Sequence, residues 1–365
     1  MNRRNFLIGG GSLIAAGGFA AAIGVKQTGS MEDYEKLAAT LRVPLALQPD
    51  DRDLIRCATL AANGHNTQPW KFRVQKNSIE ILPDYSRRTI VVDPDDHHLF
   101  ASLGCAAENL MISGAATGRA SELRFDPAEN GKVVVEMVAG QADRSPLFDA
   151  IPRRQSTRAD YDGRPASIAE LRSLDAAAQV NGVNMFLITD RPQINLVRDL
   201  VTAGNSAQMA DADFVEELKQ WIRFNPRDAI TMRDGLFSAC SGNPSAPSWL
   251  GRPIFSLSSK TKSENDKYIR QIDGSAGIAV FVADKNDPEH WVQAGRSCQR
   301  FALQATALGL KTAFINQPTE VSKLRPDLAA LVGMQGYRPN IVMRFGHGEA
   351  MPMSLRRPVN AVLMT

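Results

Sequence analysis

The stretch "LGCAAENLMISGAATG" (residues 103–118) returns in altered form as "AGRSCQRFALQATALG" (residues 294–309), 191 positions later and without a gap. In this alignment Gly104 falls on Gly295, and Gly118 falls on Gly309. Both runs carry apolar residues at helical spacing, and both end in a glycine that stops a helix. A strand-like run follows each of them, "SELRF" and "KTAFI". The sequence therefore predicts two copies of one structural unit.

A weaker similarity upstream locates an insertion. "RDLIRCATLAANG" (52–64) resembles "AELRSLDAAAQVNG" (169–182) at an offset of about 116, so the second copy holds roughly 75 extra residues. We expect a first repeat over residues 31–150 and a second over 151–365, with the insertion at about 200–275. Helices alternate with strands and polar turns, which predicts an α+β fold with a mixed sheet packed against helices.

The insertion contains "SACSGNPSAPSWLGRPIF" (238–255), which is rich in Gly, Pro and Ser and is expected to be irregular. Long segments of this kind are often lids over sites, and a disordered linker is the alternative. Four aromatic residues favour a segment that docks onto the rest of the chain: Trp221, Phe224, Trp249 and Phe255.

Composition restricts the class of protein. The chain is 44% hydrophobic and 22% charged, with a net charge of +3 and no basic tract, which argues against nucleic-acid binding. The run "DPDDHHLF" (93–100) would suit a metal, but we expect Asp95 and Asp96 to cap the following helix and predict no metal site. No C-x-x-C joins the four cysteines, and we expect Cys57, Cys105 and Cys298 to be small core residues.

The N-terminus has the pattern of an export signal. Arg3 and Arg4 precede Phe6, and no charge occurs from Leu7 to Val25. Twin arginines before a weakly apolar, Gly/Ala-rich run predict a twin-arginine signal over residues 1–30, with the translocase as a partner and a periplasmic or otherwise exported location. A Sec signal or a membrane anchor also fits. Because no sharp A-x-A site follows, the signal, if retained, would anchor the chain to the membrane.

Three polar motifs are candidate binding residues. "RRQSTRADYDGRP" (153–165) places Arg154, Ser156 and Arg158 at alternate positions, which share one face of an extended segment and suit a phosphate. "GHNTQPWKF" (64–72) is a polar turn before an alternating strand, and "SLRRP" (354–358) follows the strand "NIVMRFG". The alternative for each motif is a solvated surface loop.

Together these motifs resemble the nitroreductase-like flavin enzymes. "ANGHNTQPWKF" is similar to the family's N-x-Q-P-W motif, and "RRQSTR" is similar to its R-x-S-x-[KR] motif. "ALGLKTAFINQP" (307–318) and the closing strand with "SLRRP" resemble two further family segments, so the resemblance covers roughly residues 50–358. The motifs are divided between the two copies, as in the Acg-like, two-repeat branch, which implies a monomeric pseudo-dimer with one FMN and a lid.

The resemblance implies roles residue by residue. Arg154, Ser156 and either Arg356 or Arg357 would hold the FMN phosphate, and Arg158 would lie at the N1/O2 edge of the ring. Asn66, with Asn63 and Gly64 nearby, would face the ring from the first copy. Backbone groups of Asn316 and Gln317 would pass near N5. Trp70 would be structural. No catalytic residue is predicted.

The resemblance also implies an exported FMN-dependent oxidoreductase. Electrons would pass through flavin N5 from a small-molecule donor to nitro or quinone-like acceptors. The alternatives are a protein that stores or sequesters FMN with little turnover, and a relic that binds no flavin.

Overall fold

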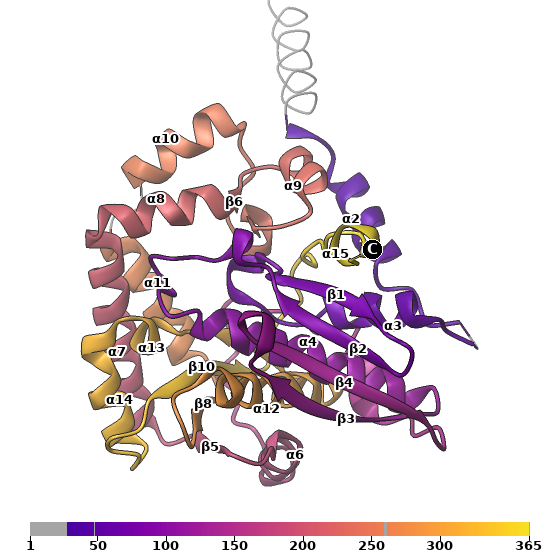
Figure 1. Cartoon of the computed structure of the whole chain (residues 1–365). Coiled ribbons are helices and arrows are strands. Elements are labelled where there is room, and N and C mark those ends of the chain that lie inside the picture. Colours follow the sequence, from indigo (N-terminus) through magenta and orange to yellow (C-terminus); the bar gives the residue numbers. More distant parts are fainter. Residues whose placement is uncertain (1–27, 47, 259–260, 365) are drawn as a thin grey trace, which may run out of the picture.

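The computed structural model describes residues 28–46, 48–258 and 261–364. Two four-stranded antiparallel sheets and two long central helices form its main body (Figure 1). The predicted α+β class is therefore confirmed. The twin-arginine motif and its apolar run lie outside the described residues.

The first sheet contains β1 (Trp70–Val74), β2 (Ser78–Pro83), β3 (Arg119–Asp126) and β4 (Lys132–Ala139), in the order β1-β2-β4-β3. In β1, Trp70 and Phe72 are fully buried, whereas Lys71 and Arg73 are not. This alternation buries one face of the strand against helices, as the sequence pattern predicts. Trp70 belongs to the core of the first half, which agrees with its expected structural role.

The second sheet repeats this plan. It contains β5 (Val183–Ile188), β8 (Gly277–Ala283), β9 (Lys311–Phe314) and β10 (Pro339–Gly346), in the order β5-β8-β10-β9. In both sheets the first, second, fourth and third strands along the chain lie side by side, and every neighbouring pair is antiparallel. β8 and β10 are buried along their whole length because helices cover both faces of this sheet.

Helices α4 (His97–Ala116) and α12 (Pro288–Ala307) pack against each other between the two sheets. A Cβ atom at Gly104 would overlap the Val292 carbonyl, and one at Gly295 would overlap the Ala101 carbonyl. Each glycine thus meets the residue three positions before its counterpart, a reciprocal contact typical of a two-fold interface. Of the described helices, α4 alone is long and apolar enough to cross a membrane, but most of it is buried inside the protein.

The α7–α11 segment (residues 191–273) interrupts the second half. It contains α7 (Arg191–Ala210), α8 (Ala212–Trp221), α9 (Pro226–Met232), α10 (Ser248–Ser258) and α11 (Thr261–Asp273), with the short parallel strands β6 (Ile222–Arg223) and β7 (Leu236–Phe237). The stretch 238–255, expected to be irregular, instead ends in helix α10. Phe224 docks under Gly251, whereas Trp249 is 70% exposed, so only part of the expected aromatic docking occurs.

Shorter helices complete the two halves. α2 (Met31–Thr40), α3 (Asp51–Thr59), α5 (Pro146–Ala150) and α6 (Ile168–Ala178) precede the second sheet, and α13 (Gln317–Glu320), α14 (Arg325–Leu331) and α15 (Val359–Val362) follow β9. Two bridges join segments that lie far apart in the sequence. The C-terminal tail forms a bridge to the first sheet at Phe72, and Ser156 forms one to the second sheet at Thr312.

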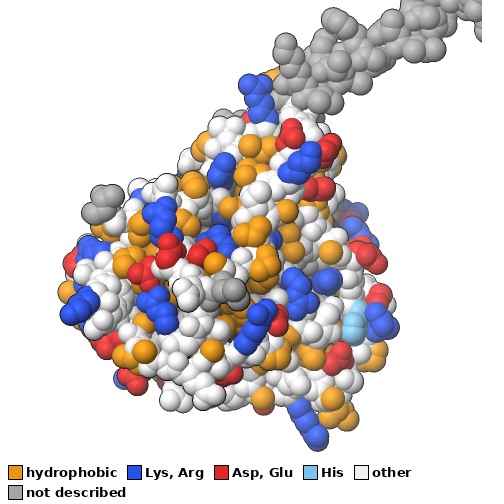
Figure 2. Space-filling view, turned by 90° about the vertical axis from the view of Figure 1, so that its right-hand side faces the viewer, with side chains coloured by type: hydrophobic (Ala, Val, Ile, Leu, Met, Phe, Trp, Pro, Cys, Tyr) orange, Lys and Arg blue, Asp and Glu red, His pale blue; other side chains and the backbone are white. Residues whose placement is uncertain are grey.

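The surface carries mixed charge. Figure 2 shows Lys and Arg side chains interspersed with Asp and Glu, and no single-sign patch covers this face. All four cysteines are buried and free, so the expectation that Cys57, Cys105 and Cys298 are core residues is confirmed.

Candidate functional site

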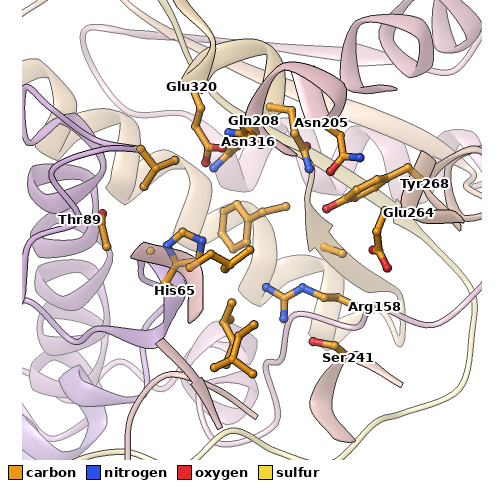
Figure 3. A pocket seen from close by; sticks show the side chains of 18 of the residues that line it. His65, Thr89, Arg158, Asn205, Gln208, Ser241, Glu264, Tyr268, Asn316 and Glu320 are labelled. Atoms are coloured by element: carbon orange, nitrogen blue, oxygen red, sulfur yellow. Dashed lines mark hydrogen bonds between the residues drawn. The ribbon is translucent and has the colours of Figure 1, made fainter. Parts of the chain in front are cut away.

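A cavity of about 510 Å³ lies where the two halves meet the α7–α11 segment (Figure 3). This volume falls within the range of small-molecule and cofactor sites. The α7–α11 segment supplies 19 of the 37 lining residues, and these include Asn205, Gln208, Phe224, Ser241, Glu264, Lys267 and Tyr268. The first half contributes residues that include Asn63, Gly64, His65, Thr89, His98 and Ser102.

The polar turn "GHNTQP" is held in a strained conformation. His65, Asn66 and Gln68 have φ values of 46°, 53° and 54°, in the left-handed region that side chains other than Gly rarely adopt. The turn is held by Gln68, whose backbone N–H donates to Asn63 Oδ1 (2.9 Å) and whose side chain donates to the Arg233 carbonyl (2.9 Å). Strain of this kind persists only where surrounding contacts fix the backbone, and it is common at functional sites.

This conformation turns His65, not Asn66, into the cavity. The Asn66 amide donates to the carbonyls of Gly235 (3.0 Å) and Leu355 (3.2 Å), and its oxygen accepts from Arg356 (2.9 Å). Asn66 therefore joins the first half to the second, but it does not line the cavity, whereas the resemblance implied that it would face the ring. Burial and the nearby Arg158 charge lower the pKa of His65 to about 4, so its imidazole is neutral at pH 7.

Five of the predicted residues line the cavity together: Asn63, Gly64, Arg158, Asn316 and Gln317. Arg158 projects toward the middle of the cavity, across from His65 (Figure 3). Asn316 accepts a hydrogen bond from the Val342 backbone N–H (2.9 Å), which fixes the end of β9 beside the cavity. The buried Gln317 Oε1 has no partner within ordinary hydrogen-bond geometry among the described residues.

The other five predicted residues do not line the cavity. Arg154 donates to the Leu60 carbonyl (3.1 Å), and Arg356 donates to the carbonyls of Thr59 (2.8 Å) and Ala61 (3.2 Å). Both guanidinium groups thus lie at the C-terminal end of α3, where the helix dipole favours cations. Arg357 turns toward Asp84 and the Ala361 carbonyl, which argues against a phosphate role for it. Ser156 lies beside Thr312, and Asn66 makes the contacts described above.

An excess of unpaired positive charge surrounds the site. Among the described residues, none of five buried or half-buried arginines forms an ion pair with a carboxylate; they are Arg42, Arg154, Arg158, Arg344 and Arg356. Burial lowers the pKa of Arg42 to about 10, and burial and the neighbouring Arg42 and Arg154 charges lower that of Arg356. Within the described part of the chain, Arg154 Nε and Arg344 Nε have no hydrogen-bond partner. Buried charges are normally paired, so this arrangement suits an anionic ligand.

Sequence reasoning missed several cavity residues. Arg344 in β10 is fully buried, and its guanidinium lies 3.9 Å from the Tyr161 ring centroid. His98 and Glu320 face each other on the cavity wall, and Tyr268 comes from α11. The only signal for His98 was its place at the start of the long helix, and Glu320 follows the "NQP" run by two positions.

The acidic run before α4 caps this helix in a different way from the prediction. Asp93, not Asp95 or Asp96, accepts from the backbone N–H groups of His98 (2.9 Å) and Leu99 (3.0 Å). Asp96 adopts a left-handed backbone and pairs with Arg88, and Asp95 pairs with Arg338. No group of three or more His, Cys, Asp or Glu side chains suited to a metal ion occurs among the described residues.

The chain is similar over nearly its whole length to two proteins of Mycobacterium tuberculosis. One, named "Putative NAD(P)H nitroreductase Rv3131", is 27% identical over 94% of this chain and 96% of its own length. The other, named "Putative NAD(P)H nitroreductase acg", is 22% identical over 85% of this chain and 94% of its own length. No family model matches the chain.

Solved structures give weaker matches. A nitroreductase with bound FMN from Desulfitobacterium hafniense is 15% identical, and the match covers 60% of this chain and 98% of that chain with a TM-score of 0.38. The FMN-dependent nitroreductase NfnB from Mycobacterium smegmatis, in complex with NADPH, is 11% identical, with 60% and 91% coverage and a TM-score of 0.37. Likenesses of this size transfer no function to the chain.

Proposed function

We propose that this chain is an FMN-dependent oxidoreductase of the nitroreductase type. The observation that carries the proposal is its similarity, over 94% of the chain, to a protein named as an NAD(P)H nitroreductase. The cavity supports it independently, because it combines a suitable volume with amide groups and with Arg158 and Arg344, which form no ion pair among the described residues. The relatives' names do not favour an FMN-storing protein.

The residues around the cavity fit this cofactor in part. Arg158 would place a fixed positive charge beside the ring, where it stabilises negative charge on the reduced pyrimidine. Asn63 and Gln317 offer amide groups, which both donate and accept hydrogen bonds, as a pyrimidine edge requires. When bound, FMN supplies two-electron chemistry through its ring. The α7–α11 segment would cover the ring and exclude water, the role of a lid.

The arrangement of the halves supports a duplicated chain that forms a pseudo-dimer around one cofactor. The two sheets share one strand order, and Gly104 and Gly295 make reciprocal contacts at the centre. His65 and Asn63 come from the first half, and Arg158 and Gln317 come from the second. One cavity thus uses both copies, so a single chain suffices for the site.

The proposed donor and the nitro acceptors follow from the names of the relatives, the quinone acceptors from the resemblance described in the sequence analysis, and the location from the N-terminus. NAD(P)H is the proposed donor, and nitro compounds or quinones are the proposed acceptors. Export by the twin-arginine pathway rests on Arg3, Arg4 and the uncharged run to Val25. Such export delivers a folded chain, which would carry its cofactor with it.

The first experiment is to purify the chain from the cytoplasm and record its absorption spectrum. Flavin bands that bleach on addition of NADH or NADPH and return with a quinone or nitro acceptor would support the proposal. Titration with FMN and riboflavin, followed by thermal unfolding, measures binding apart from turnover. Colourless protein that neither ligand stabilises would refute it.

A further inference from the structure

A His–Glu pair lies at one end of the cavity, away from Arg158. His98 comes from α4 of the first half, and Glu320 is the last residue of α13 in the second half. His98 Nε2 lies 3.6 Å from Glu320 Oε1. Figure 3 shows Glu320 close to Gln208 and Asn316 at the cavity wall. Both members of the pair line the cavity, so the pair can contact a bound molecule.

Neighbouring groups fix the orientation of both side chains. Gln208 of α7 donates to Glu320 Oε2 (2.6 Å), which leaves the other carboxyl oxygen toward His98. The His98 backbone is held by Asp93, and its ring packs against His97 with centroids 4.6 Å apart. Three elements thus hold one carboxyl group and one imidazole at a defined separation.

A second, small cavity adjoins the main cavity at His98. Its volume of about 10 Å³ is close to what one water molecule needs. Gly64, Thr89, His98 and Ser102 line both cavities. The remaining residues of the small one are Thr67, Pro69, Arg87, Arg88, Asp93 and Leu99. His98 is therefore one of four residues that the main cavity shares with a space about the size of one water molecule.

Electrostatics favour a pair that carries one shared proton. Burial raises the pKa of Glu320, against the lowering effects of His98, Gln208 and Arg325, while Asp93 adds to the rise. Burial lowers the pKa of His98, and Arg338 and Arg325 add to the lowering, whereas the carboxylates of Glu320 and Asp95 oppose it. A carboxyl that stays protonated to higher pH beside a neutral imidazole is a suitable general acid.

We propose that Glu320 is the proton donor to the acceptor that is reduced in this cavity, and that His98 reloads it. The inference rests on the proposed function, which supplies the reductant, a reduced flavin. A quinone that gains a hydride becomes an oxyanion with one proton still to gain. The Glu320 O–H bond breaks as the new O–H bond on the product forms, and the resulting carboxylate regains a proton through His98. Gln208 is a positioning residue.

The test compares two acceptors for the variant Glu320→Gln. A quinone gains two electrons and two protons, whereas ferricyanide gains one electron and no proton. We expect the quinone rate to fall about 100-fold, the low end for the loss of general acid catalysis, and the ferricyanide rate to stay within about 2-fold. Glu264→Gln makes the same change elsewhere in the same cavity, at a carboxylate that pairs with no histidine among the described residues, and it should keep the ratio of the two rates.

The pH profile gives a second measure. The wild-type quinone rate should fall as pH rises through the raised pKa of Glu320, because only the protonated carboxyl donates. Glu320→Gln should remove this limb. The Gln208 hydrogen bond favours the carboxylate form of Glu320, so its loss in Gln208→Leu should move the falling limb of the pH profile to higher pH. If the His98–Glu320 pair were only structural, neither substitution would change the pH dependence of the quinone rate.

A third measure needs no cofactor. In the cofactor-free chain, the NMR signals of the His98 ring should report the titration of Glu320, because the charge of the carboxylate acts on the ring, and Glu320→Gln should remove this step. Equal loss with both acceptors, or an unchanged quinone rate with an unchanged pH limb, would overturn the proposal. Failure of the proposed function looks different, because then wild-type protein would reduce neither acceptor.

Discussion

The crossing of α4 and α12 makes a sharp prediction for Gly295→Ala. The added Cβ would lie 2.7 Å from the Ala101 carbonyl carbon and closer still to its oxygen, whereas ordinary contact begins near 3.4 Å. Because the Cβ would meet backbone atoms, which cannot rotate away, the helices would have to separate by roughly 1 Å. Overpacking of this kind costs about 3 kcal/mol, the upper end of the usual range. Alanine returns about 1 kcal/mol through helix propensity, so we expect a net loss of about 2 kcal/mol.

Urea unfolding followed by circular dichroism measures this loss. Gly104→Ala should lose a similar amount, because it meets the Val292 carbonyl in the reciprocal contact. Gly114→Ala, on α4 like Gly104, is the matched control. Its nearest neighbour would be 3.0 Å away, so its loss should be much smaller. If Gly295→Ala were as stable as the wild type or more stable, the two helices would not be in backbone contact, and the reciprocal packing that supports a pseudo-dimer would be wrong.

Three further predictions concern the cavity. Arg158→Met should weaken FMN binding by about 1–3 kcal/mol, measured by fluorescence titration, because it removes a charged hydrogen-bond donor; unchanged affinity would place the ring elsewhere. Asn66→Ala should lower the free energy of unfolding in urea by about 1–3 kcal/mol, because one Arg356 N–H donor and the carbonyls of Gly235 and Leu355 lose their hydrogen-bond partner. A loss of FMN affinity without a loss of stability would contradict this. The wild type should lose at most about 3 kcal/mol of stability as pH falls from 6.5 toward 4, because in this window His65 gains a proton in the unfolded state but not in the folded state. His65→Asn should remove this loss.

Helical spacing and a shared glycine placed α4 and α12 correctly. Helical periodicity and a terminating glycine are local properties of a sequence, and both are clear in these two helices. Alternation likewise identified β1. The resemblance supplied the motifs around the cavity, and five of the ten residues it named lie on the cavity wall.

The missed residues share a physical cause. A left-handed backbone at His65 and Asn66 reverses which side chain faces inward, and no spacing rule anticipates such a reversal. His98 and Glu320 lie 222 positions apart and meet only because α4 and α13 pack against one cavity. Long-range contacts of this kind depend on tertiary packing, which neither propensity nor motif spacing encodes.

The arginines at the end of α3 decide which predicted phosphate ligand is plausible. Arg356 already donates from all three guanidinium nitrogens to carbonyls and to Asn66, whereas Arg154 makes one such bond and keeps Nε free. A phosphate offers charge-assisted hydrogen bonds, which are stronger than those to carbonyls, so Arg154 gains more by turning toward it. Arg154→Ala should therefore weaken FMN binding by about 1–3 kcal/mol and leave riboflavin binding, which involves no phosphate, nearly unchanged. Arg356→Ala should instead lower stability in urea with both ligands absent. Equal losses for FMN and riboflavin in Arg154→Ala would mean that the arginine supports the cavity wall and does not bind the phosphate.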